Sequence, residues 1–114
     1  MDDDRLVRVL RALADPKRFR MVQELAQAGE LCCGDLGRRF DVSQPTVSHH
    51  LKLLAEAGVL TVRHDGQHHL ISVNRSVLDE ASALLPARLR ARRPRVRRDG
   101  RSRVVPGNSR LRPR

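Results

Sequence analysis

Two groups of residues in this 114-residue chain have the types and spacing to do chemistry. Cys32 and Cys33 are adjacent, and neighbouring thiols can bind a soft, thiophilic ion or can be oxidised. The second group is the polar run SQPTVSHH at residues 43–50, whose hydroxyl, amide and imidazole groups can hydrogen-bond to base edges. The elements around these residues decide whether either kind of site can be built.

Two amphipathic helices are predicted over the first 29 residues. In the first helix, apolar residues recur at i, i+3, i+4 and i+7: Leu6, Val9, Leu10 and Leu13. Asp15 and Pro16 fit the N-cap and first position of the second helix, and Gly29 ends it. The face of the second helix that is expected to pack in the core carries Phe19, Val22, Leu25 and Ala26.

Residues 29–58 are predicted to form two short helices joined by a tight turn at Asp41 and Val42. Ser43 caps the second of these helices and Gly58 ends it. Its apolar stripe consists of Val47, Leu51, Leu54 and Ala55. The opposite stripe, with Ser48 at its edge, consists of Pro45, His49, Lys52 and Glu56. The helix is therefore anchored on one side and exposes hydrogen-bonding groups at its N-terminal end, where a helix-turn-helix contacts bases.

A two-stranded β wing and a last helix follow. Leu60 and Val62 alternate with polar residues, and the Asp65–Gly66 pair favours a type I′ hairpin. The last helix carries Leu78, Ala81, Leu84 and Leu85, and Pro86 is expected to end or kink it. The predicted fold is thus mainly α with a two-stranded β wing, a winged helix-turn-helix in the order α-α-α-α-β-β-α.

The positive charge is concentrated at one end of the chain. Residues 88–114 hold 12 of the 23 Lys and Arg residues and one of the 13 acidic residues, which leaves residues 1–87 nearly neutral. We therefore expect a winged helix-turn-helix domain over residues 1–87. Residues 88–114 are expected to hold the end of the last helix and then a disordered, Arg-rich tail. That tail is either a solvated extension or a sequence-independent phosphate-binding segment.

Composition excludes several classes of protein. No run of 18 apolar residues could span a membrane, and the acidic start MDDDRLVRVL is unlike a signal peptide, so a cytoplasmic location and no membrane partner are expected. Adjacent cysteines close almost no loop, so the thiols should be reduced. Two phenylalanines are the only aromatic rings apart from histidine, too few for a base-stacking platform. No nucleophile motif surrounds the cysteines, so an enzyme is not expected.

The residues also resemble a known family. The order of helices and wing, with LRALADPKRFRMVQEL, ELCCGDL and SQPTVSHHLKLLAEAGVLTVRHDGQHHLISVN, is similar to the ArsR/SmtB winged-helix bacterial repressors over about residues 5–85. The resemblance implies a homodimer, joined mainly by the first and last helices, that binds a pseudo-two-fold-symmetric operator and leaves it when an inducer binds. Gln44, Ser48 and His49 match positions at which the family contacts DNA, whereas Pro45 replaces a small polar residue often found there.

We therefore expect a repressor that binds double-stranded DNA at specific sequences. The candidate DNA contacts are Gln44, Pro45, Thr46, Ser48, His49, Lys52, Arg63, His64 and His68. His50 lies nearer the apolar stripe and is expected to pack between helices. The charges of the wing are either groove contacts or solvated side chains. A winged-helix module that binds another protein is the alternative.

The resemblance also bears on the thiols. ELCCGDL lies where arsenic-responsive members have an ELCxC-type motif, although the second cysteine is shifted by one and Gly34 and Gly37 stand in place of further thiols. It implies As(III) or Sb(III) as an inducer held by Cys32 and Cys33, whose thiols near a helix N-terminus should have lowered pKa values. Oxidation of the pair, or a ligand-independent repressor with structural cysteines, are the alternatives. A zinc site in the last helix is not expected, because residues 74–89 contain no histidine.

Overall fold

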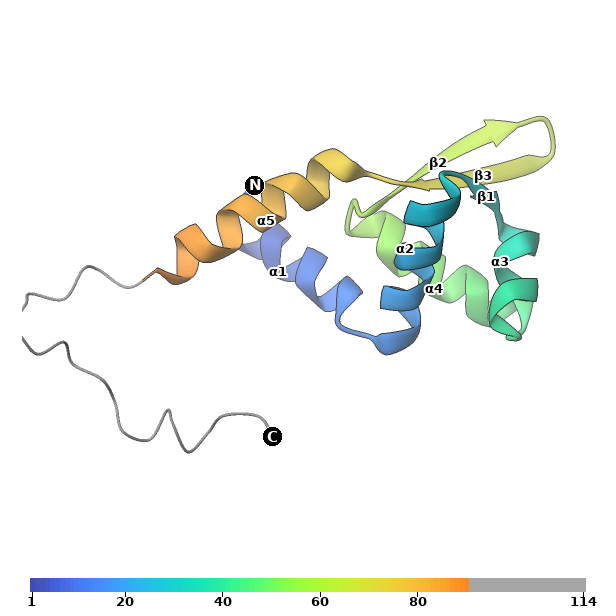
Figure 1. Cartoon of the computed structure of the whole chain (residues 1–114), viewed down its shortest axis with the longest axis horizontal. Helices are drawn as coiled ribbons and strands as arrows, with labels where there is room; N and C mark the ends of the chain where they lie inside the picture. The colour runs from blue at the N-terminus through green and yellow to red at the C-terminus, as the bar shows by residue number, and fades with distance from the viewer. Residues whose placement is uncertain (91–114) are drawn as a thin grey trace, which may run out of the picture.

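The computed structural model describes residues 1–90 of the chain. Its elements are α1 (Asp3–Leu13), α2 (Pro16–Ala28), β1 (Leu31–Cys32), α3 (Cys33–Phe40), α4 (Gln44–Glu56), β2 (Leu60–Asp65), β3 (His68–Val73) and α5 (Arg75–Leu89). Helices α1 to α4 and the sheet form one body, from which α5 extends beside α1 (Figure 1). This is the predicted winged helix-turn-helix, with α3 and α4 as the helix pair and β2 and β3 as the wing. The predicted tail beyond residue 90 lies outside the described residues.

The helices begin at the caps that the sequence indicates. The Asp15 carboxylate accepts hydrogen bonds from the backbone N–H groups of Lys17 and Arg18, both at 3.0 Å, and Pro16 occupies the first turn of α2. Gly29 follows α2 with a φ of 86°, a left-handed conformation that glycine adopts without steric cost. Asn74 caps α5 by accepting from the backbone N–H of Val77. These local signals mark where α2 begins and ends and where α5 begins.

The sheet contains a short strand that the sequence pattern did not predict. β1 pairs antiparallel with β3, which places β3 between β1 and β2. β1 is only two residues long, so it has no alternation from which to recognise it. It ties the end of α2 and the start of α3 to the base of the wing.

The wing turn differs from the predicted one. Asp65 and His68 are cross-strand partners, so the two loop residues are Gly66 and Gln67 rather than Asp65 and Gly66. Of these two, only Gly66 has a positive φ, at 63°. A type I′ turn needs positive φ at both central residues, whereas glycine at the first position is typical of type II′. The predicted type I′ turn is therefore wrong.

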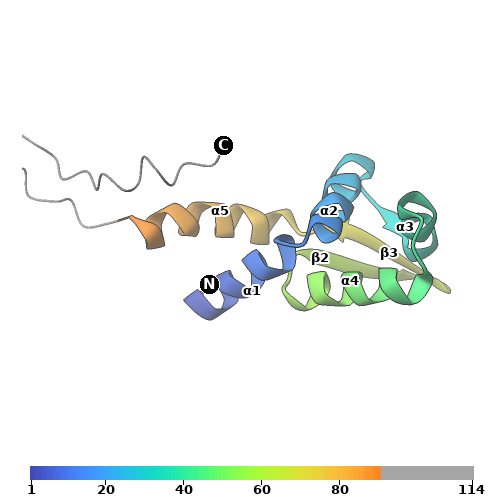
Figure 2. The same ribbon diagram turned by 90° about the horizontal axis from the view of Figure 1, so that it is seen from below.

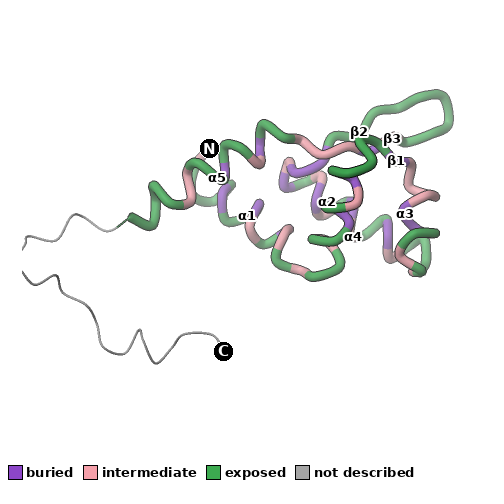
Figure 3. The backbone as a smooth tube through the Cα atoms, viewed as in Figure 1, coloured by how far each residue is buried: buried purple, intermediate pink, exposed green. Residues whose placement is uncertain are grey.

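The core lies between helices α1 to α4, the first part of α5 and the sheet (Figure 3). Its fully buried side chains include Met21, Leu25, Leu36, Leu54 and Ile71. The predicted core face of α2 is partly wrong, because Phe19 is 50% exposed and Ala26 is also exposed. Met21 and Leu25 face the core and are four residues apart, so the core face is rotated away from the stripe that contains Phe19.

Helix α5 continues through Pro86 to Leu89, so of the expected end or kink at Pro86, the end is wrong. Proline lacks the N–H that would bond the carbonyl of Ser82, but it leaves the rest of the helix free to form. The residues after it are held by α1, since Arg88 pairs with the Asp3 carboxylate and donates to the Met1 carbonyl at 3.0 Å. Within residues 1–90, no helix has the length and apolar character needed to cross a membrane.

Candidate nucleic-acid interface

A tight turn between α3 and α4 sets the start of the exposed helix. Asp41 follows α3 in the left-handed conformation, with φ 50° and ψ 47°. Aspartate tolerates this conformation more readily than most residues do. The Ser43 hydroxyl then accepts a hydrogen bond from the Thr46 backbone N–H at 3.4 Å and lies 2.9 Å from the Thr46 hydroxyl. Thr46 is thus engaged in capping the helix as well as being a candidate DNA contact.

The apolar side of α4 is fixed in the core, and its polar side is open to solvent. Val47 and Leu54 are fully buried and Leu51 is 6% exposed. The exposed candidate DNA contacts on this helix are Gln44, Pro45, Ser48, His49 and Lys52. The structure therefore brings together five of the six candidates on α4 as one exposed surface, and leaves Thr46 partly covered.

Gln44 lies directly against α3. A Cβ atom on Gly37 would come within 2.4 Å of the Gln44 amide nitrogen Nε2 and 3.3 Å of its Cδ. Gly37 is buried, and its missing side chain is what leaves room for the Gln44 amide in this position. In the sequence, Gly37 stands out only as a position without a thiol, so this packing role was not predicted.

The two adjacent histidines have different surroundings. His49 is exposed, whereas His50 is half-buried and its Nδ1 lies 3.4 Å from a guanidinium nitrogen of Arg18. Arg18 also donates from Nε to the Ala12 carbonyl at 2.8 Å, so it joins the end of α1 to α2 and α4. Burial lowers the pKa of His50, an effect that the nearby Asp15 carboxylate opposes. His50 lies among the helices, and His49 faces solvent.

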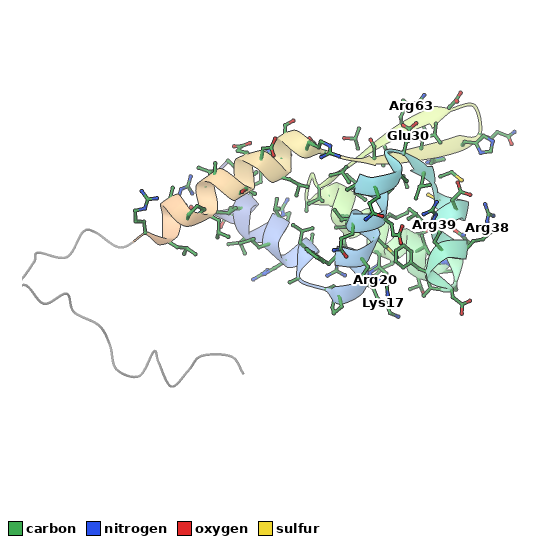
Figure 4. The ribbon with its side chains drawn as sticks, viewed as in Figure 1. Lys17, Arg20, Glu30, Arg38, Arg39 and Arg63 are labelled. Carbon is green, nitrogen blue, oxygen red and sulfur yellow. The ribbon has the colours of Figure 1, made fainter. Side chains whose placement is uncertain are left out.

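Of the wing candidates, Arg63 does not share a surface with α4. The Arg63 guanidinium makes two hydrogen bonds to the Glu30 carboxylate, at 3.2 and 2.9 Å. Both side chains lie above the strands in Figure 4, whereas α4 lies below them. His64 packs its ring against the ring of His69, with centroids 4.5 Å apart. His68 is exposed beside the turn, paired across the strands with Asp65.

A residue that sequence reasoning missed lies between the wing and α4. His69 lines a hollow of about 170 Å³ together with Ser48, Lys52 and Val62. The signal was present, because His69 is the cross-strand partner of His64 and pleating would place both rings on one face. The wing face nearest to α4 is thus built by His64, Val62 and His69.

The two thiols lie at the start of α3. The Cys32 thiol donates to the Asp35 carboxylate at 3.2 Å, and Asp35 also forms an ion pair with Arg38. The Cys33 side chain is half-buried against the core, and this burial, together with Cys32 beside it, raises the pKa of its thiol. The lowered pKa expected for Cys33 at a helix N-terminus is therefore wrong, because desolvation outweighs the backbone hydrogen bond that lowers this pKa.

The surroundings of the thiols are open. Cys32 and Cys33 line a shallow hollow of about 370 Å³ with Gly34, Arg38, Gln67, His68 and His69. Within the part of the chain that the structure describes, no group of three or more His, Cys, Asp or Glu side chains is placed to hold a metal ion. Any ion held by the pair would take two sulfur ligands from one chain.

Known proteins share this arrangement. A family model described as a helix-turn-helix domain matches residues 13–63. An arsenical resistance operon repressor of Staphylococcus xylosus is 41% identical over 71 residues, which cover 62% of this chain and 67% of the relative. The transcriptional repressor SdpR of Bacillus subtilis (strain 168) is 36% identical over 73 residues, which cover 64% of this chain and 80% of the relative.

A solved structure agrees in fold. The homodimeric winged helix-turn-helix DNA-binding domain of a possible ArsR-family transcriptional regulator from Mycobacterium bovis has a TM-score of 0.63 and 21% identity, covering 82% of this chain and 95% of that chain. The two sequence relatives are transcriptional repressors and not enzymes. Their similarity, together with the α3–α4 helix pair and the β2–β3 wing, shows that the chain belongs to the ArsR family of winged helix-turn-helix transcriptional repressors.

Proposed function

We propose that this repressor is a homodimer that recognises specific double-stranded DNA by placing the N-terminal end of α4 in the major groove. The observation that carries the proposal is the exposed surface at that end, formed by Gln44, Pro45, Ser48 and His49 on a helix whose opposite side is anchored in the core. A major groove admits one α-helix, and each base pair there presents a distinct pattern of donors and acceptors.

Each side chain on this surface has a role that fits its chemistry. The Gln44 amide can pair with the two adenine groups N6 and N7, and the Ser48 hydroxyl and His49 imidazole can donate to or accept from base edges. Pro45 has no donor, so it contacts bases through its apolar ring. Thr46 presents the hydroxyl that also contacts Ser43, and Lys52 contacts phosphate.

The wing contributes contacts to the DNA backbone. His68 beside the turn and His64 on the strand reach the groove edge that flanks the major groove. Arg63 joins them by exchanging Glu30 for a phosphate, because the pair is exposed and an exposed ion pair contributes little to stability.

The dimer is proposed to form through α1 and α5. These helices carry two of the large apolar side chains exposed in residues 1–90, Val7 at 44% and Leu89 at 74%. The M. bovis domain of the same fold is homodimeric. A two-fold dimer would place its two α4 helices in successive major grooves, one helical turn or about 34 Å apart. Since the target is chromosomal DNA, the dimer would act in the cytoplasm.

The proposed inducer is a trivalent metalloid, As(III) or Sb(III), bound by the sulfur atoms of Cys32 and Cys33. Arsenous acid would exchange two of its hydroxyl groups for the two thiolates, and the two thiol protons would leave with those hydroxyls as water. Three observations support this choice: the adjacent thiols, the open hollow beside them and the similarity to the arsenical resistance operon repressor of S. xylosus. Metalloid binding would break the Cys32 thiol hydrogen bond to Asp35 at the start of α3, the helix that packs against α4.

Two alternatives concern the same residues. In the first, the protein represses without a ligand and both cysteines are structural, which the half-buried Cys33 thiol and its raised pKa favour. In the second, a peroxide-type oxidant takes two electrons and two protons from the thiols and joins them as a disulfide.

A fluorescence-anisotropy titration tests the whole proposal. Reduced protein is titrated onto a duplex from the region upstream of its own coding sequence and onto a scrambled duplex of the same composition, each with and without arsenite. We expect tighter binding to the upstream duplex, and release by arsenite that a Cys32→Ser variant no longer shows. Equal binding to both duplexes would instead indicate the protein-interaction module, with only salt-sensitive attraction to DNA.

The titrations with and without arsenite distinguish between the possible inducers. Specific binding that arsenite leaves unchanged would overturn the metalloid while keeping the repressor. Release by hydrogen peroxide alone, reversed by a dithiol reductant, would identify oxidation in its place. Insensitivity to both agents would establish the ligand-independent repressor.

A further inference from the structure

On the side of α4 away from the wing, three arginines gather around a hollow. The hollow has a volume of about 280 Å³ and is lined by Arg8, Arg11, Ala12, Arg18, Leu53 and Glu56. Arg8 and Arg11 come from α1, one helical turn apart, and both are exposed. The sequence pattern did not predict a functional role for these two residues.

The hollow lies beside the exposed surface of α4 that is proposed to bind DNA. On α4, the exposed residues His49, Lys52 and Glu56 form the outermost stripe. Ser48 and Ala55 on one side of that stripe line the hollow toward the wing, and Leu53 on the other side lines the hollow toward α1. In Figure 2, α1 and α4 lie along the same lower edge of the molecule, and α2 and α3 lie above them. The α1 arginines therefore flank α4 on the surface that would face DNA.

Within residues 1–90, neither Arg8 nor Arg11 forms an ion pair with a carboxylate, although Asp4 lines a hollow with both of them. In the same described part of the chain, four other arginines each pair with a carboxylate: Arg38, Arg39, Arg63 and Arg88. Glu56 lies in the hollow beside α4 with Arg8 and Arg11 but pairs with neither. Arg18 directs its guanidinium to the carbonyls of Ala12 and Arg11 and is held in place by them. Two exposed guanidinium groups thus remain available to an anion.

A helix in the major groove has a phosphate backbone on each side, because the groove is only about 12 Å wide. The wing lies on one side of α4, and α1 is the element on the other. We infer that Arg8 and Arg11 contact the DNA phosphates that flank α4 on the side opposite the wing. This inference rests on the proposed function.

The proposed dimer specifies which phosphates these are. Asp3, on another side of α1, reaches Arg88 of α5, and Val7 of the proposed dimer interface lines a hollow beside Arg8 and Arg11. The dimer interface would therefore adjoin the two arginines, which also line the hollow against α4. Because α1 lies nearer the two-fold axis than α4 does, Arg8 and Arg11 contact phosphates between the two half-sites. The wings contact phosphates at the outer ends of the operator.

The salt dependence of binding tests this inference in the full-length dimer. Each phosphate contact contributes about 0.9 to the slope of log affinity against log salt concentration. Arg8→Gln removes one contact per protomer, so we expect the slope to fall by about 1.8, which extrapolates to roughly 30-fold weaker binding near 0.15 M salt. Arg11→Gln should behave alike, and Arg8→Lys should retain most of the affinity.

Arg20→Gln is the matched control. Arg20 is exposed on α2 and stacks over the Phe40 ring at 5.9 Å, on the side of the molecule that faces the viewer in Figure 4, with α4 behind it. The Arg20→Gln substitution removes the same charge as Arg8→Gln. We expect it to leave the slope of log affinity against log salt concentration within about 0.3 of the wild-type value. A loss of slope as large as that of Arg8→Gln would show that only net charge matters and would overturn the inference.

Duplexes in which selected phosphates are replaced by uncharged methylphosphonates show which phosphates Arg8 contacts. In a duplex with methylphosphonates between the half-sites, Arg8→Gln should cause no further loss of affinity, whereas methylphosphonates at the outer ends should leave its effect intact. The reverse pattern would overturn the inference. In another outcome, the wild-type protein binds the upstream duplex specifically while an Arg8→Gln/Arg11→Gln variant keeps the same salt dependence of binding. That result would overturn the inference and leave the proposed function standing. Absence of specific binding by the wild type would overturn the proposed function and this inference with it.

Discussion

A substitution at Gly37 separates the stability of the helix pair from the position of one DNA-contacting side chain. Gly37 lies inside α3, and its backbone is not in the left-handed region, so alanine fits its conformation. The new Cβ would lie 2.4 Å from Nε2 of Gln44 and 3.8 Å from Cγ2 of Val47. The second distance is an ordinary contact, so only the end of the flexible Gln44 side chain must move, by about 1 Å or more.

The two expected effects of Gly37→Ala have opposite signs. Alanine inside a helix is more stable than glycine by about 0.5–1 kcal/mol, so the free energy of unfolding should rise or stay unchanged. A displaced Gln44 amide should lose its base contact, which is worth about 1–3 kcal/mol. Operator binding should therefore weaken by roughly 5- to 150-fold per half-site while the protein becomes no less stable.

Urea unfolding followed by circular dichroism measures the first effect, and anisotropy with operator and scrambled duplexes measures the second. In a Gln44→Ala background, Gly37→Ala should have no further effect on operator binding, since the contact is already absent. Operator affinity that is unchanged by Gly37→Ala, or an equal loss in both backgrounds, would refute the reasoning about Gln44.

Three further predictions follow from single side chains. His49→Ala should weaken operator binding by about 1–3 kcal/mol without changing binding to scrambled DNA, and equal losses on both duplexes in anisotropy would remove His49 from base readout. Leu54→Ala should lower the free energy of unfolding by about 2–5 kcal/mol in a urea titration, because Leu54 is fully buried; a loss below 1 kcal/mol would mean that α4 is not anchored there. Burial holds the pKa of His50 below its ordinary value of 6.5, so the unfolded state binds more protons. Stability should therefore fall as the pH drops from 6.5 toward 5 in unfolding measurements, and a His50→Gln variant that keeps the same pH slope would contradict this assignment.

Local signals in the sequence predicted the helix ends. Asp15 with Pro16, Gly29, Ser43 and Gly58 all lie where the structure begins or ends a helix, because caps and left-handed positions depend on neighbouring residues alone. Features that depend on distant contacts were missed. β1 exists because Leu31 and Cys32 pair with β3, and Pro86 stays inside α5 because α1 holds the residues after it.

In the candidate site too, features set by neighbouring residues were predicted and features set by distant contacts were missed. Periodicity alone placed His49 on the exposed side of α4 and His50 near the core, and both lie there. The ion pair of Arg63 with Glu30 spans 33 residues, so the pattern of the wing could not indicate it. The pKa of Cys33 depends on how deeply α3 packs against the core, and the arginines of α1 reach α4 only through the tertiary fold.

The central claim is that two copies of α4 lie in successive major grooves of one DNA site. Methylation-interference footprinting on the upstream duplex tests it directly, because methylation of guanine N7 blocks the major groove. We predict two interfering clusters about 10–10.5 base pairs apart, with the dependence on bases near Gln44 and His49 lost in a Gln44→Ala/His49→Ala variant. A single cluster, or interference spread evenly along the duplex, would contradict the account.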